Sequence, residues 1–240
     1  MMKKHLKQMQ VGVLFLIFCA ITFGSCQKND SLGLFKKDDN AGNVPDSVIP
    51  EAIRSQLDSL MPIYTGTTPP DISGEFLANN LVLVGSSLGE DASEIGLSGY
   101  WADLYFAFTK SNGKYTYQEK NASATGSGDD VTVTVTVVGS NKNFTAYFID
   151  NSSSSDFTSK QSTVISGTMS SDGISGFYYA FIMLDKNDPD NELVPINTYR
   201  VFKDGDGWVD INNWVSDSQV QMSYPAAKQQ VKSMIQILQK

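Results

Sequence analysis

Residues 131–137 read Val-Thr-Val-Thr-Val-Thr-Val without an interruption. In an extended chain successive side chains point to opposite faces, so the valines would share one face and the threonines the other. A helix would spread both residue types around its axis. The pattern therefore predicts a strand with one buried face, and a shift of one residue in its pairing would turn every valine toward water.

A similar composition extends from Ile72 to about residue 213. Short segments rich in Val, Ile, Thr, Tyr and Phe alternate there with clusters of Gly, Asn, Ser and Asp, which is typical of an all-β sandwich or barrel. Asn112-Gly113 predicts a two-residue hairpin turn, because this pair readily takes the positive φ angles that such a turn needs. We expect strands near residues 73–84, 98–110, 113–121, 130–138, 143–150, 161–170, 174–184, 194–203 and 207–213.

Two helices are expected to flank the β-rich segment. Residues 50–61 place Ile53, Leu57 and Leu60 on one helical face. A second amphipathic pattern begins at Pro225 and predicts a C-terminal helix. Residues 177–184 are apolar on both faces, so the outer face of this strand should be covered by one of the helices or by a partner protein.

The N-terminal segment has the order of features that is typical of a secretory signal peptide. Lys3, Lys4 and Lys7 precede an apolar run over residues 11–23. This run is too short to cross a bilayer, since a spanning helix needs about 20 residues. Gly24-Ser25-Cys26 follows it, and an ordinary signal peptide cleaved near Ser25, with a free cysteine, is one interpretation.

The same residues resemble the lipobox of bacterial lipoproteins, in which Cys26 is lipidated and becomes the acylated N-terminus. Phe23, in place of the usual Leu, is similar to the looser pattern of Bacteroidetes-type lipoproteins. The resemblance implies a lipoprotein signal peptide over residues 1–25. The polar, aperiodic composition of the next residues predicts a flexible tether over 26–47, and we expect one β-barrel domain with flanking helices over 48–240. Acyl chains would hold the protein in the outer membrane, on its periplasmic or its cell-surface face.

Composition excludes several functions for the chain after residue 25. It has 15 basic against 26 acidic residues, a net charge of −11, so nucleic acid is not an expected partner. The only histidine, His5, precedes this point, which excludes Ser-His-Asp catalysis and His-ligated zinc. Cys19 is removed with the signal and Cys26 carries lipid, so no disulfide within the chain is expected. We expect no cofactor.

Carboxylates offer two further candidate sites. A glycan hydrolase needs two facing carboxyl groups, and Glu75, Asp103 and Glu119 lie within predicted strands. Asp204, Asp206 and Asp210 suggest calcium, but the spacing does not match an EF-hand loop, and a hairpin turn is the preferred interpretation. The acidic stretch 185–192 fits no EF-hand register either, so we expect no metal site.

Gly74-Glu75-Phe76 opens the β-rich segment and is similar to the Gly-x-Trp motif of the first lipocalin strand. Arg200, on a late predicted strand, would correspond to the arginine that packs across that aromatic ring. Residues 70–214 thus resemble lipoproteins of lipocalin-like (calycin) form. The resemblance implies an up-and-down antiparallel barrel of about eight strands, with a β-sandwich as the alternative. A ligand in its mouth would contact aromatic and polar side chains, for which the candidates are Trp101, Tyr105, Phe106, Tyr117, Tyr147, Tyr179 and Arg200.

These observations favour a lipid-anchored, non-enzymatic binding protein of the cell envelope that holds a small apolar or glycan ligand in the barrel. A structural lipoprotein is the first alternative, and it would bind another envelope protein through an exposed apolar patch over residues 177–184. A carboxylate-dependent glycan hydrolase is the second. The ligand-binding function predicts a cavity that opens at one barrel mouth and is lined by aromatic and a few polar side chains. The interaction function predicts a filled barrel with an exposed apolar patch, and the hydrolase predicts paired carboxyl groups at the base of a cleft.

Overall fold

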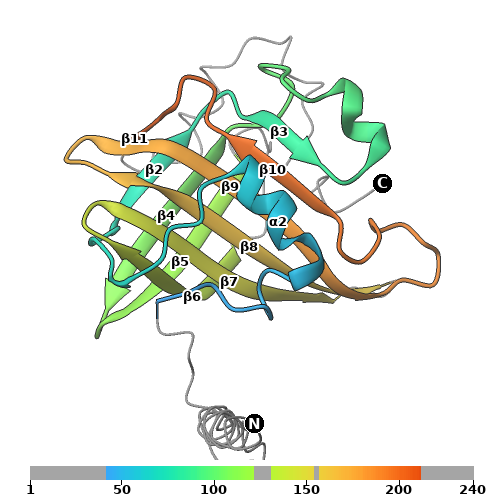
Figure 1. Cartoon of the computed structure of the whole chain (residues 1–240), viewed down its shortest axis with the longest axis horizontal. Coiled ribbons are helices and arrows are strands. Elements are labelled where there is room, and N and C mark those ends of the chain that lie inside the picture. The colour runs from blue at the N-terminus through green and yellow to red at the C-terminus, as the bar shows by residue number, and fades with distance from the viewer. Residues whose placement is uncertain (1–41, 122–130, 154–156, 212–240) are drawn as a thin grey trace, which may run out of the picture. The chain divides into compact units, whose positions relative to one another are not determined.

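The computed structural model describes residues 42–121, 131–153 and 157–211 (Figure 1). The proposed signal peptide, Cys26, most of the tether and the predicted C-terminal helix lie outside these residues. The described part is mainly β. Its elements are the helix α2 (Glu51–Leu60), the short 3-10 helix η1 (Gly89–Ser93) and the strands β1 (Thr67–Thr68), β2 (Gly74–Ala78), β3 (Val82–Ser86), β4 (Leu104–Ser111), β5 (Lys114–Asn121), β6 (Val131–Ser140), β7 (Asn143–Ser153), β8 (Thr158–Met169), β9 (Gly173–Asn187), β10 (Tyr199–Lys203) and β11 (Trp208–Ile211).

Eight antiparallel strands close into a barrel. The ring runs β2-β4-β5-β6-β7-β8-β9-β11, and β11 pairs again with β2. β10 pairs with the later part of β9, and β3 pairs with β10, so these two strands extend the wall beyond the ring. β1 adds a short parallel pairing to β6. The predicted barrel is confirmed, and the sandwich alternative is excluded by the closure of the ring.

Local sequence patterns predict strand β6 and the hairpin turn correctly, whereas the expected strand over residues 73–84 is divided into β2 and β3, and the expected strand over 194–203 begins only at Tyr199. The valines at 133, 135 and 137 of β6 belong to the interior core, whereas Thr134 and Thr136 are exposed. Ser111 pairs with Lys114 across the predicted hairpin turn. Asn112 has a φ of 50° and Gly113 a φ of 76°, the left-handed conformations that this turn requires.

α2 covers the outer wall of the barrel. Leu57 is fully buried, and the inner face of the helix packs in one apolar cluster with Ala180 and Ile182 of β9 and Val201 of β10. Figure 1 shows α2 lying across this part of the wall. The expected helix is therefore present and covers the outer face of β9. Val44 is buried in the same cluster, so the last residues assigned to the tether also pack on the barrel.

One predicted hairpin is wrong. The turn over residues 204–207 joins β10 to β11, but both strands pair with the same edge of β9 and not with each other. The chain therefore bends at residues 204–207 and then continues along the same edge of β9. β2 and β3 meet at a matching bend, because β2 pairs with β11 and β3 pairs with β10.

Asp204 holds the two bends together. This residue is fully buried, and its carboxyl oxygens accept hydrogen bonds from the backbone N–H groups of Asn79 (2.9 Å), Asp206 (3.1 Å), Gly207 (3.1 Å) and Trp208 (3.2 Å). Burial, together with the neighbouring Asp206, raises the pKa of Asp204 to about 7.

This raised pKa predicts that stability falls as pH rises. An aspartate in the unfolded chain has a pKa of about 3.9, so the folded state holds the Asp204 proton more tightly than the unfolded state does. The resulting stabilisation is complete below about pH 4 and is lost as pH rises through 7, by at most about 4 kcal/mol. Urea unfolding at several pH values should show a shallower decline for Asp204→Asn, whereas the exposed Asp210→Asn should follow the wild type. An unchanged pH dependence in Asp204→Asn would contradict the assignment.

Candidate functional site

The two ends of the barrel differ in chemistry. β5, β7 and β9 end, and β4, β6, β8 and β10 begin, at one end, which we call the mouth. The loops over residues 87–103 and 188–198 connect strands there. At the opposite end the Tyr115 hydroxyl accepts a hydrogen bond from the Ile72 N–H (3.4 Å) and donates one to Asp71 (3.0 Å). At that end the segment before β2 is thus fixed to the barrel through Tyr115, and the candidate site lies at the other end, toward the mouth.

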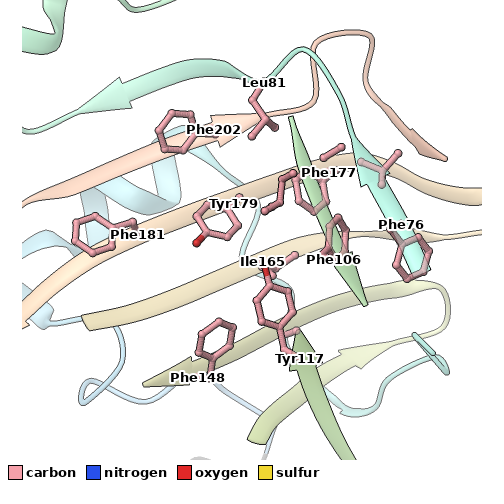
Figure 2. Close-up of a cluster of buried hydrophobic side chains, with 14 of the residues drawn as sticks. Phe76, Leu81, Phe106, Tyr117, Phe148, Ile165, Phe177, Tyr179, Phe181 and Phe202 are labelled. Atoms are coloured by element: carbon pink, nitrogen blue, oxygen red, sulfur yellow. The ribbon is translucent and has the colours of Figure 1, made fainter. Parts of the chain in front are cut away.

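Aromatic rings pack together in the interior of the barrel (Figure 2). Phe106 stacks on Phe76 with a centroid distance of 5.2 Å and on Phe177 at 5.3 Å. Tyr117 packs against Phe148 at 4.9 Å. All five side chains belong to the interior core. The candidate ligand residue Phe106 is thus a core residue, with 1% of its surface exposed.

Toward the mouth, the inward-facing side chains are polar. Strand alternation carries the inward face from Tyr117 to Glu119 on β5. It continues from Phe148 to Asp150 on β7, and Asp150 pairs with Gln161 of β8. We call the inward polar residues of this region the mouth cluster, and its members are Tyr117, Glu119, Asp150, Gln161, Thr163 and Tyr179.

Hydrogen bonds and charge link the members of the mouth cluster. Tyr117 donates to Glu119 Oε2 at 2.5 Å, and Gln161 Nε2 donates to Asp150 Oδ2 at 3.4 Å. Burial, and secondly the charge of Asp150, raises the pKa of Glu119. Burial and then the charge of Glu119 raise the pKa of Tyr179 well above its usual value. The carboxylates and phenols therefore share one poorly solvated region.

Two buried oxygens in this region have no hydrogen-bond partner among the described residues. They are Gln161 Oε1 in the mouth cluster and Ser159 Oγ, one inward position closer to the rim. Ser159 is 5% exposed and is the cross-strand partner of Ser152, whose hydroxyl donates to Asp150 at 3.3 Å. Leaving such groups unpaired costs about 1–3 kcal/mol each, so an additional partner is expected.

An open hollow adjoins these residues at the rim. Its volume is about 350 Å³. The lining is polar and comes from the ends of β7, β8 and β9: Asn151, Ser152, Ser153, Thr158, Ser159, Lys160, Asp185, Lys186 and Asn187. Ser152 and Ser159 connect this hollow, which we call the rim hollow, to the mouth cluster.

Arg200 and Trp101 form a separate buried group. The guanidinium of Arg200 binds both carboxyl oxygens of Asp91, at 2.6 and 3.0 Å, and lies 5.9 Å from the Trp101 ring. Asp91 is in η1, so this pair fastens the loop over residues 87–103 to β10. The lipocalin resemblance had implied Phe76 as the ring beside Arg200, but Phe76 stacks on Phe106.

The other two aromatic candidates lie on the outer face. Tyr105 alternates with the inward residues Leu104 and Phe106 on β4. Tyr147 packs with the cluster beneath α2. The structure thus brings Tyr117 and Tyr179 together in the mouth cluster and places Tyr105 and Tyr147 away from it.

The carboxylate candidates separate in the same way. Glu75 is exposed on the face of β2 opposite Phe76, and Asp103 accepts a hydrogen bond from the Asn80 N–H at 2.7 Å. The Asp204 carboxyl group accepts the backbone hydrogen bonds that hold the bend described above. Within residues 42–121, 131–153 and 157–211, no three His, Cys, Asp or Glu side chains gather in a way that would hold a metal ion.

Sequence reasoning missed the mouth-cluster residues Asp150, Gln161 and Thr163, together with Ser159. These residues come from the halves of β7 and β8 nearest the mouth, and the sequence pattern does not give the register that brings them together. The one available signal was the alternation of Asp150 with the inward Phe148 and Phe144 of the same strand.

Comparison with known proteins gives no family for this chain: no family model, no curated protein and no solved structure matches it. In the part of the chain that the structure describes, no helix has both the length and the apolar character to span a bilayer.

Tyr117→Phe should raise the pKa of Glu119 further. The Tyr117 hydroxyl stabilises the ionised carboxylate, and its removal should lower the acid dissociation constant about tenfold, equivalent to about 1.4 kcal/mol. Carboxyl-carbon NMR titration of the labelled protein would measure this change. Tyr178→Phe, on the outer face of β9, is the control and should leave the titration unchanged. An unaltered titration in Tyr117→Phe would contradict the contact.

Proposed function

We propose that this chain is an envelope lipoprotein, anchored through Cys26, which binds a small molecule at the mouth of its barrel without transforming it. The barrel fold is compatible with ligand binding. The observation that carries the proposal is the mouth cluster with its unpartnered acceptor, Gln161 Oε1, beside the rim hollow. A bound ligand would supply the missing hydrogen-bond donors.

The neighbouring side chains fit a ligand with both apolar and polar parts. Phe148, Tyr179 and Phe181 belong to the interior core next to the polar residues of the mouth. An apolar body could pack on these rings while a polar group faces Glu119 and Asp150. Such a division of contacts is usual in small-molecule sites.

The alternative role in binding another envelope protein loses the surface on which it depended. That role predicted a filled barrel, in agreement with the packed interior core, together with an uncovered apolar face over residues 177–184. α2 and the residues before it pack on this face, so it offers no open apolar patch in the described chain.

A second candidate function is carboxylate-dependent glycan hydrolysis at Glu119 and Asp150. The raised pKa of Glu119 favours it, because a general acid must retain its proton to a higher pH than an ordinary glutamate does. Release of sugars from a glycan by the purified protein, and loss of that activity in Glu119→Gln, would support this function over binding alone.

Lipid anchoring can be tested with labelled palmitate in the native host. The label should enter the wild type and the matched Cys19→Ala variant but not Cys26→Ala, which should leave the membrane fraction. A Cys26→Ala protein that stays in the membrane fraction would contradict the anchor.

Native mass spectrometry of protein purified from its own host tests ligand binding. We expect one non-covalent small molecule per chain, released on denaturation. Gln161→Leu should lose it, because the ligand then lacks an acceptor, whereas Tyr178→Phe should retain it. A ligand-free wild-type chain that also takes up nothing from a host extract would overturn the binding function.

A further inference from the structure

We infer that the ligand of the mouth is an organic cation, an ammonium group on an apolar body. This inference rests on the proposed binding function and specifies its ligand class. Three features of the mouth support it: the excess of acceptors over donors in the mouth cluster, the negative charge around the mouth, and the aromatic rings beside it.

The inward groups offer more acceptors than donors. Glu119 and Asp150 are acceptors when ionised, and Gln161 Oε1 accepts from no described group. Ser159 Oγ, which is buried and likewise unpartnered, lines the rim hollow next to them. An ammonium group has three donors and no acceptor, so it complements such a site better than a hydroxyl or a carboxylate does.

The surroundings carry negative charge. The loops over residues 87–103 and 188–198 contain seven acidic residues and no Lys, Arg or His. Two cations at this end are already paired: Arg200 binds Asp91, and Lys186 binds Asp188 at 2.9 Å. Lys160, at the rim, is exposed and lies across the strands from Asp185. The field at the mouth therefore favours the approach of a cation.

An organic cation fits better than a metal ion. A calcium site takes six to eight oxygen ligands, usually with several carboxylates, and the described residues hold no group of three acidic side chains. Aromatic rings, in contrast, attract an ammonium group. Tyr117 donates a hydrogen bond to Glu119, and Tyr179 is buried and lies close enough to Glu119 for the Glu119 charge to raise the Tyr179 pKa further.

Titration calorimetry of the full chain with two probes of matched size tests the charge requirement. Near neutral pH, 2-phenylethylammonium should bind about tenfold or more tightly than neutral 2-phenylethanol. Glu119→Gln with Asp150→Asn should reduce the preference to about threefold or less. Asp58→Asn, which removes an exposed carboxylate from α2, controls for net charge and should keep the full preference. Circular dichroism would verify that each variant is folded.

The outcomes separate this inference from the binding function. Equal binding of the two probes, or a preference that persists in the double variant, would overturn the cationic ligand. So would binding of neither probe by a chain that retains a neutral or anionic molecule from its host. In each of these cases the binding function itself still stands. It is overturned only if the wild-type chain binds neither probe, carries no host-derived ligand and takes up nothing from a host extract.

Discussion

The closure of the barrel depends on β9. This strand of 15 residues pairs with β8 along one edge and with β11 and then β10 along the other. At its start the backbones come so close that a Cβ on Gly173 would lie 2.1 Å from the Val209 carbonyl oxygen, at a φ of 155°. Only glycine fits there without a shift. The inward aromatic side chains of β9 pack in the core, and its outward side chains pack against α2.

The interior of the barrel has an apolar part and a polar part. The close-packed phenylalanines of the interior core bury apolar surface without burying a polar group of their own. Toward the mouth the same inward positions carry Glu119, Asp150 and Gln161. Burial of these groups costs stability unless partners are present. Under the proposed function, a ligand bound at the mouth would offset that cost.

Much of the fold could be predicted from local patterns, because alternation and turn residues act over a few positions. The valine face of β6, the Asn112-Gly113 turn and the helix over residues 50–61 are of this kind. The bend at Asp204 could not, since it depends on pairing with β9, which is distant in sequence. The same limit applied to the site: Asp150 and Gln161 meet through register, and Tyr105 and Phe106 differ only in the face they occupy.

The packing of residues 44–61 on the outer wall sets where the folded unit begins. One apolar cluster joins Val44, Ile49 and Leu57 to Ala180 and Ile182 of the wall. A version of the protein that started after residue 61 would therefore expose an apolar part of the wall to water. Expression of an isolated barrel for crystallisation or screening therefore has to retain this leading segment, which acts as a permanent cover for the wall rather than as a spacer.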